Sequence, residues 1–202
     1  MTETLLELKG LEVTFKTRRG TLKAVDDLSL SINKGEILGI VGESGAGKSM
    51  TGAAIIGLID PPGRVSAGEV WFEQERVDAH PERLRGRQIS MVFQDPLTSL
   101  NPLRTVGDQL IETILVHRNV SKSEAVKRPR DGSAEVGIDP DRLTAYPPAF
   151  SGGMRQRVVV ALALATEPKL VIADEPTTAL DVSVQAQVLD LLKKLCRERG
   201  TS

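Results

Sequence analysis

Hydrophobic and polar residues alternate along the first part of the chain in the way that half-buried β-strands require. The alternation is imperfect over Leu5–Phe15 and clean over Leu28–Ile32, after which Asn33–Gly35 has the composition of a turn. We therefore predict two antiparallel strands. The short apolar run Glu36–Val41 predicts a buried strand, and Met50–Leu58 predicts a helix.

The middle of the chain mixes short apolar runs with stretches rich in proline and charge. Glu69–Phe72 and Gln88–Phe93 predict strands, and the charged segment Pro81–Arg87 predicts a short helix. Asp95–Pro102 contains two prolines and predicts a loop. Apolar residues then recur with helical spacing over Val106–His117, which predicts a helix with one buried face.

A second helix is expected to start at the capping box Ser121–Glu124. Pro129 and Gly132 follow within its body, where proline costs about 3 kcal/mol and glycine about 1 kcal/mol. We therefore expect the helix to break near Arg128. A loop after the break predicts fast hydrogen exchange around residues 125–137.

The last third of the chain predicts a helix, a strand and a longer helix. Met154–Ala165 has a helical pattern, and Lys169–Ala173 is a continuous apolar run typical of a parallel strand that is covered on both faces. Val182–Arg199 is amphipathic, and Gly200 has the residue type that ends helices.

Composition narrows the class of protein. The 202 residues are 40% hydrophobic and 26% charged, which is ordinary for a globular protein with a core. The net charge of −1 does not favour binding to nucleic acid or to an anionic membrane. Cys196 is the single cysteine, so an internal disulfide is excluded. The N-terminus lacks a signal-peptide pattern and the longest apolar run, Val158–Ala165, is too short to cross a bilayer, so we expect a cytosolic protein that is soluble on its own.

The segment 42–49 matches the phosphate-binding pattern G-x-x-x-x-G-K-[ST] at every fixed position, between a predicted strand and a predicted helix. Glycines let backbone N–H groups point at phosphate oxygens, and the helix N-terminus adds partial positive charge. Lys48 can reach the β- and γ-phosphates, and the Ser49 hydroxyl can bind Mg²⁺. The alternative is a glycine-rich turn that matches by chance. The segment consists of Gly42, Glu43, Ser44, Gly45, Ala46, Gly47, Lys48 and Ser49.

Two further segments, 174–175 and 151–153, are suited to phosphate chemistry. Asp174 and Glu175 end a predicted buried strand, where the first would hold Mg²⁺ through water and the second would orient the attacking water. Their alternative role is to cap the strand. Ser151–Gly153 opens a helix and forms a second arrangement of N–H groups that suits an anion, which suggests that two chains sandwich one nucleotide.

Together these motifs resemble those of the nucleotide-binding subunit of an ABC transporter, in the family's order over nearly the whole chain. Residues 42–49 match Walker A, and 170–175 match Walker B with its glutamate. The signature is resembled by 150–154, with Phe150 and Met154 where leucine and glutamine are commoner. Gln94 matches the Q-loop glutamine, 179–181 the D-loop, and Phe15 the aromatic residue that stacks on adenine. From the residues alone, Phe15 is more commonly a core side chain than one that stacks on a base, and a glutamine at a strand end, such as Gln94, is usually only solvated.

The resemblance implies an α/β fold, with a P-loop NTPase (RecA-like) core, an antiparallel β subdomain and an inserted α-helical subdomain. One domain would span 1–202, divided into 1–94 (antiparallel β and Walker A core), 95–155 (helical subdomain with the signature) and 156–202 (Walker B part). The implied cofactors are ATP and Mg²⁺. The implied roles are catalysis by Glu175 and Gln94, metal binding by Ser49, Gln94 and Asp174, and nucleotide binding by Phe15, residues 42–49 and Ser151, Gly152 and Gly153.

The stretch 93–102 resembles importer ATPases for oligopeptides, dipeptides or, in some members, nickel. The resemblance implies a subunit that lies peripherally on the inner face of the cell membrane. It would bind permease subunits and pair head to tail with a second ATPase subunit, the same or different, and would not bind nucleic acid.

Three departures from the family pattern limit the expected activity. The strand that carries the family's switch histidine, and the C-terminal extension of peptide-importer ATPases, would lie beyond Ser202. The third is that the family has an unbroken apolar helix where this chain has Pro129–Ser133. We therefore expect ATP binding with weak turnover, and the alternative function is a truncated, catalytically impaired nucleotide-binding fragment. A soluble ABC ATPase acting on nucleic acid or ribosomes, and a P-loop kinase, are less favoured by the motifs.

Overall fold

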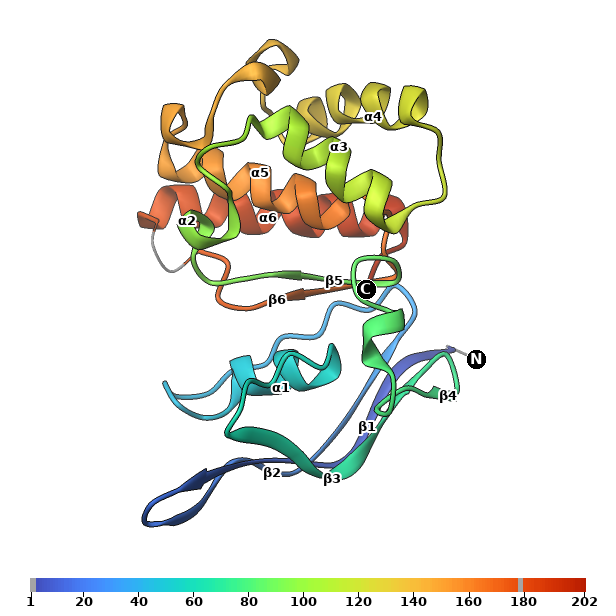
Figure 1. Cartoon of the computed structure of the whole chain (residues 1–202), viewed down its shortest axis with the longest axis vertical. Helices are drawn as coiled ribbons and strands as arrows, with labels where there is room; N and C mark the ends of the chain where they lie inside the picture. The colour runs from blue at the N-terminus through green and yellow to red at the C-terminus, as the bar shows by residue number, and fades with distance from the viewer. Residues whose placement is uncertain (1–2, 178–179) are drawn as a thin grey trace. The chain divides into compact units, whose positions relative to one another are not determined.

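A computed structural model describes residues 3–177 and 180–202, and these divide into two compact units (Figure 1). The first unit holds the chain as far as Arg85 together with Ser202, and the second holds Gly86–Thr201. Each unit has its own set of buried apolar side chains. The predicted phosphate loop belongs to the first unit, and the predicted catalytic and signature residues belong to the second.

An antiparallel sheet with the strand order β2-β1-β3-β4 forms most of the first unit (Figure 1). In the centre, β1 pairs on one side with β2 and on the other with β3, so that Leu6 lies opposite both Ile32 and Phe72. The antiparallel strands that the alternation predicted are confirmed and run longer than expected. Their bounds are β1 (Thr4–Thr17), β2 (Gly20–Asn33), β3 (Gly63–Phe72) and β4 (Glu75–Arg76).

Helix α1 (Lys48–Ile55) contacts β1 and β2. Its buried residues include Ala54 and Ile55, and the helix begins directly after Gly47. The predicted helix therefore exists, although it starts two residues earlier and ends three residues earlier than the pattern suggested. The predicted charged helix is a single 3₁₀ turn, η1 (Pro81–Arg83).

The prediction of a buried strand at 36–41 is wrong. The segment is not a strand, and within the first unit it forms no ladder with β1–β4. A strand is stabilised by its cross-strand neighbours, and the antiparallel sheet of this unit offers the segment none. The apolar run marks side chains that favour burial, but it does not supply the strand against which they pair.

The second unit contains a two-stranded parallel sheet, in which β5 (Ile89–Val92) pairs with β6 (Leu170–Ala173). Both strands were predicted from their apolar runs and are confirmed. Figure 1 shows α5 and α6 running alongside this pair in the same unit. The expectation that β6 is covered on both faces stays a prediction; along the strand Leu170 is buried, Val171 and Ile172 are half-buried and Ala173 is exposed.

The helices of the second unit enclose a core centred on α5, which contacts α2, α3, α4, α6 and β5. The predicted helices 106–117 and 182–199 are confirmed residue for residue as α3 and α6. Among the described residues, no helix combines the length and the apolar character needed to cross a membrane. The bounds are α2 (Pro96–Ser99), α3 (Val106–His117), α4 (Lys122–Glu135), α5 (Gly152–Leu164), α6 (Val182–Arg199), and the 3₁₀ helices η2 (Pro140–Thr144) and η3 (Pro147–Ala149).

The expected break near Arg128 is wrong, because α4 continues through Pro129 to Glu135. Proline lacks the N–H that would bond to the carbonyl of Ala125. The helix persists because Ala125, Pro129 and Ser133, four residues apart, are all buried on one face. Tertiary packing therefore outweighs the unfavourable propensity.

The segment expected as a loop at 95–102 contains the one-turn helix α2. The side chain of Asp95 accepts a hydrogen bond from the Leu97 N–H at 2.8 Å, and Pro96 occupies the first helical position. Both are recognised signals for a helix start, which the count of two prolines concealed.

Candidate functional site

The phosphate loop leads directly into α1, and its glycines adopt the conformations for which the residue type is suited. Gly45 has φ 83° and Gly47 has φ 85°, both in the left-handed region. A Cβ atom on Gly47 would lie 2.3 Å from the carbonyl oxygen of Ala24, whereas one on Gly45 would meet nothing within 4 Å. Gly47 is thus required by both backbone conformation and space, and Gly45 by conformation.

The ammonium group of Lys48 lies over the loop itself. Its Nζ donates hydrogen bonds to the carbonyl oxygens of Gly42 at 2.8 Å and Glu43 at 2.9 Å. The loop is closed further by a hydrogen bond from the Ala46 N–H to the Glu43 carbonyl at 3.2 Å. A positive charge above a glycine-rich turn at a helix N-terminus fits the donor set that phosphate requires.

Thr51, which the sequence reasoning missed, ties α1 to the loop. Its backbone N–H and its hydroxyl both donate to the Gly47 carbonyl, at 2.9 Å and 3.0 Å. The side chain is buried. The signal was present in the sequence, because a threonine four residues after a helix N-cap can bond back to that residue's carbonyl.

Phe15, near the end of β1, is half-buried. Its ring covers Gly63 of β3, where an added Cβ would lie 2.5 Å from the ring edge. The aromatic ring is therefore held by the sheet of the first unit, the same unit that carries the phosphate loop.

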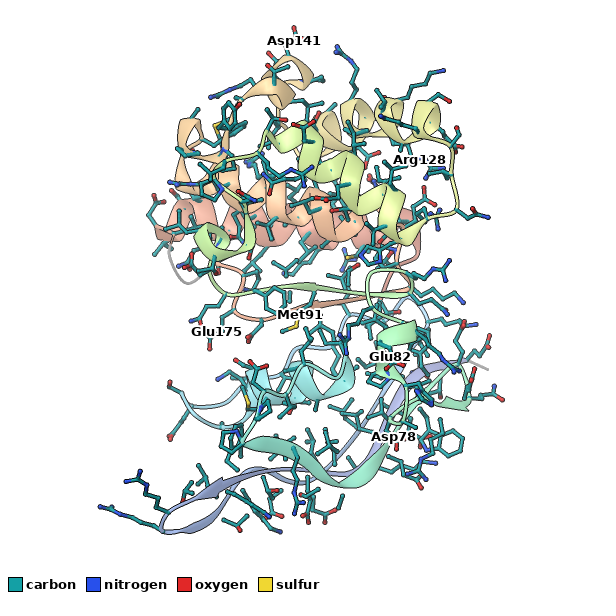
Figure 2. All side chains as sticks on the ribbon, viewed as in Figure 1. Asp78, Glu82, Met91, Arg128, Asp141 and Glu175 are labelled. Carbon is teal, nitrogen blue, oxygen red and sulfur yellow. The ribbon has the colours of Figure 1, made fainter. Side chains whose placement is uncertain are left out.

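In the second unit, the ends of β5 and β6 meet at one edge of the parallel sheet. Val92 lies opposite Ala173, and the Asp174 N–H donates to the Val92 carbonyl at 2.9 Å. Immediately beyond, Gln94 Nε2 donates to Glu175 Oε2 at 3.1 Å. The structure thus brings together two residues that are 81 positions apart and that the sequence predicted as catalytic (Figure 2 labels Glu175).

Glu175 also has an unusual backbone. Its φ of 42° lies in the left-handed region, where a residue with a Cβ costs about 1–2 kcal/mol. The Thr177 N–H bonds to the Glu175 carbonyl at 2.7 Å and stabilises the turn. Such strain is concentrated at functional sites, because there the surrounding structure maintains it. The Glu175 side chain is exposed and Asp174 is half-buried.

Ser151, Gly152 and Gly153 form the N-terminus of α5. The Ser151 hydroxyl caps the helix by accepting from the Met154 N–H at 3.4 Å, and no acidic side chain occupies the first turn. A Cβ on Gly153 would lie 2.7 Å from Val184 Cγ1 of α6, so glycine permits the close approach of the two helices. Ser151 is exposed, which leaves this helix terminus accessible to an anion.

Of the D-loop positions, Ala179 lies outside the described residues. Asp181 caps α6, because its side chain accepts hydrogen bonds from the Val184 N–H at 3.2 Å and from the Ser183 hydroxyl at 2.9 Å. Neither His80 nor His117 belongs to a metal cluster: in the part of the chain that the structure describes, no three His, Cys, Asp or Glu side chains gather around a possible ion.

Comparison with known proteins gives a consistent match. A family model described as "ABC transporter" matches residues 25–178. The oligopeptide transport ATP-binding protein OppD of Escherichia coli (strain K12) is 50% identical over 207 residues, covering 99% of this chain and 61% of that protein. The dipeptide transport ATP-binding protein DppD of Bacillus subtilis (strain 168) is 48% identical, covering 99% and 62%. The chain thus spans about three fifths of the length of these relatives.

Solved structures of ABC transporter ATPases have a fold similar to that of this chain. The dimeric, post-hydrolysis structure of the ATP-binding cassette MJ0796 bound to ADP and Pi superimposes with a TM-score of 0.84 at 30% identity, covering 98% of this chain and 85% of that one. A cassette from Clostridium perfringens, cbiO1 of the ABC transporter complex cbiONQ, has a TM-score of 0.79 at 25% identity. The predicted α/β P-loop NTPase fold is confirmed by these neighbours.

Proposed function

The chain belongs to the ABC transporter family, and on that premise we propose that it binds MgATP as the ATP-binding subunit of an importer for peptides or a related solute. The observation that carries the proposal is the phosphate loop. Its left-handed glycines, the helix start at Lys48 and the ammonium group over the loop carbonyls form a cradle suited to phosphate oxygens. The sequence identity of about 50% to oligopeptide and dipeptide transport ATP-binding proteins supports the solute class.

Each site residue has a role that follows from its chemistry. Residues 42–49 would hold the phosphates through backbone N–H groups and Lys48, and Phe15 would stack on the adenine base. Ser49, Gln94 and Asp174 would hold Mg²⁺, whose charge neutralises the phosphate oxygens when it is bound. Glu175, positioned by its hydrogen bond to Gln94, would orient and polarise water.

A second ATP-binding subunit would complete the site. Ser151, Gly152 and Gly153 form an accessible helix N-terminus without an acidic side chain in its first turn, which suits the phosphates of a nucleotide held by the partner. The neighbouring cassette MJ0796 is described as dimeric in both of its solved structures. We therefore propose a head-to-tail dimer, homomeric or heteromeric.

The proposed importer also needs permease subunits on which the ATPase docks. Near the proposed catalytic residues, the second unit exposes apolar side chains on α2 and before α3, namely Leu97 and Leu103. Tyr146 is also exposed and lies next to this region, because the Val106 N–H bonds to the Ala145 carbonyl. These side chains are suited to contact with a membrane partner, which would place the subunit on the inner face of the cell membrane.

A second candidate function is nucleotide binding with weak turnover. The distribution of the proposed site residues favours it, because the phosphate loop belongs to the first unit and Gln94 and Glu175 belong to the second. Phosphoryl transfer depends on positioning, so the loop of one unit suffices for binding more readily than for catalysis.

Calorimetry with MgATP tests the proposal. Wild-type protein and the control Lys9→Ala, which removes an exposed lysine of the same unit, are expected to bind equally. Lys48→Ala is expected to weaken binding strongly, because it removes the cation that faces the β- and γ-phosphates. Equal affinity in Lys48→Ala and wild type would refute the proposed site.

A phosphate-release assay separates the two functions. Turnover that Glu175→Gln abolishes would identify a working ATPase. ATP binding without measurable phosphate release would favour the second candidate. Absence of ATP binding in the folded wild-type chain would refute both.

A further inference from the structure

Arg142, on the 3₁₀ helix η2, reaches the start of α5 from outside that helix. Its Nη2 donates a hydrogen bond to the Ala149 carbonyl at 3.0 Å, and its Cζ lies 4.7 Å from the centroid of the Phe150 ring. Its Nη1 donates to the sulfur of Met154, in the first turn of α5, at 3.5 Å. One guanidinium group therefore contacts residues on both sides of Ser151, Gly152 and Gly153.

The segment that leads into α5 has little regular structure of its own. The 3₁₀ helix η3 ends at Ala149, Phe150 is extended with φ −103° and ψ 143°, and Ser151 is the N-cap. The capping hydrogen bond from the Met154 N–H to the Ser151 hydroxyl, at 3.4 Å, is longer than the usual range. The direction of the N–H groups in this turn therefore depends on contacts from outside it. Arg142 makes such contacts, and the Phe150 ring on which it lies is 3% exposed and so fixed in the core.

The positive charge of Arg142 lies where it does not favour the helix itself. The N-terminus of a helix carries partial positive charge, so a cation is less favourable there than an anion. Among the described residues no acidic side chain pairs with Arg142, and the adjacent Asp141, labelled in Figure 2, pairs with Arg130 at 3.5 Å. An anion bound at this terminus would be attracted both by the guanidinium group and by the helix end. The arrangement therefore suits a bound phosphate better than an empty helix terminus.

We propose that Arg142 is a positioning residue for the anion-binding terminus of α5. It holds the N–H groups of this terminus in the orientation that receives the phosphates of a nucleotide bound by a second subunit. The inference rests on the head-to-tail dimer of the proposed function. Phe150 and Met154, at which the signature departs from the commoner leucine and glutamine, are the two side chains that Arg142 contacts. An aromatic ring and a sulfur that can accept a hydrogen bond both suit a guanidinium group.

Sedimentation of the full chain with Mg²⁺ and the non-hydrolysable ATP analogue AMP-PNP tests the proposal, because the signature residues would act on the partner's nucleotide. Arg142→Ala is expected to weaken analogue-dependent dimerisation at least about tenfold, since it removes a charged hydrogen bond and a cation–π contact. Calorimetry on the monomer should give equal analogue affinity in Arg142→Ala and wild type, because the phosphate loop belongs to the first unit. A residue that only stabilised the fold would not separate these two measurements.

Arg130→Ala is the matched control. It removes an exposed arginine that pairs with Asp141, next to Arg142 in the chain, and it is expected to dimerise as the wild type does. Arg142→Lys keeps the positive charge but loses the planar group, so it should recover only part of the loss.

Two further measurements keep the test independent of folding defects. Without nucleotide, the amide resonances of Gly152 and Gly153 should shift in Arg142→Ala and stay unchanged in Arg130→Ala. If Arg142→Ala does not fold by circular dichroism, Phe150→Leu removes the ring under the guanidinium group and should weaken dimerisation to a smaller extent.

The outcomes separate the role of Arg142 from the proposed dimer. Equal dimerisation of Arg142→Ala and wild type would overturn the role of Arg142 and leave the dimer intact. An equal loss in Arg130→Ala, or full recovery in Arg142→Lys, would also overturn it, because general charge would then account for the effect. A wild-type chain that binds the analogue without dimerising would refute the head-to-tail pairing itself, and the role of Arg142 with it.

Discussion

Replacing Gly47 by alanine tests whether nucleotide binding depends on the shape of the phosphate loop, and Gly45 provides a matched control. Both glycines have nearly the same φ, 83° at Gly45 and 85° at Gly47. An alanine at either position therefore costs about 1–2 kcal/mol for the left-handed conformation. The two positions differ in the space around the added methyl group.

At Gly45 the methyl meets nothing within 4 Å, so conformation is the whole cost. At Gly47 it would lie 2.3 Å from the Ala24 carbonyl oxygen and 3.2 Å from a methyl of Val25, both in β2. Because β2 is held by its ladder with β1, relief requires a backbone shift, and overpacking of this kind costs about 1–3 kcal/mol more.

The conformational and steric costs together come to about 1–2 kcal/mol for Gly45→Ala and about 2–5 kcal/mol for Gly47→Ala. If the cost falls on the loop, ATP affinity drops roughly 5- to 30-fold in the first variant and more than about 30-fold in the second. Calorimetry measures the affinities. Urea unfolding followed by the fluorescence of Trp71, which lies in β3 of the same unit, measures any cost that falls on stability. An equal loss in the two variants, summed over both measurements, would refute the steric argument.

Three further outcomes are expected. Phe15→Ala should lower ATP affinity by about 1–3 kcal/mol, the worth of one base–aromatic stack, and unchanged affinity by calorimetry would contradict the stacking role. Pro129→Ala should raise the free energy of unfolding by about 1–2 kcal/mol, because alanine restores an N–H toward the Ala125 carbonyl; a loss in urea denaturation would show that the proline ring contributes more by packing. Burial, and secondarily Arg87, lowers the pKa of His117 below its usual 6.5. The neutral form of His117 is therefore favoured in the folded state. The free energy of unfolding that this contributes is present above pH 6.5 and is lost as the pH falls below it. In His117→Gln, the free energy of unfolding should depend less on pH between pH 7 and 5.

Local signals predicted the elements whose stability is local. The bounds of α6 could be predicted because Asp181 caps its start, the apolar spacing spans its length and Gly200, with φ 66°, closes its end. The Cys196 carbonyl accepts from the Thr201 N–H and the Arg197 carbonyl from the Gly200 N–H, which is the Schellman arrangement. Each of these features is readable from residue types at fixed offsets.

Features that depend on distant residues could not be predicted in the same way. The break expected in α4 rested on the propensities of Pro129 and Gly132, whereas the buried face on Ala125 and Ser133 depends on packing against α3, η2 and α5. Pairing between strands is equally non-local, so an apolar run such as 36–41 does not by itself identify the strand with which it would pair. The family resemblance implied that Gln94 and Glu175 share one site, but their hydrogen bond was not predicted, because nothing in local spacing relates residues 81 positions apart.

The phosphate loop is held from its C-terminal side. Gly47 lies against β2, Thr51 bonds twice to the Gly47 carbonyl, and α1 packs on β1 and β2. The half of the loop from which α1 begins is therefore fixed to the first unit before a nucleotide binds. Fixing the backbone of one residue costs about 1–2 kcal/mol of conformational entropy. Because this half is already ordered, its N–H groups can contact phosphate without that cost, which favours binding through preorganisation.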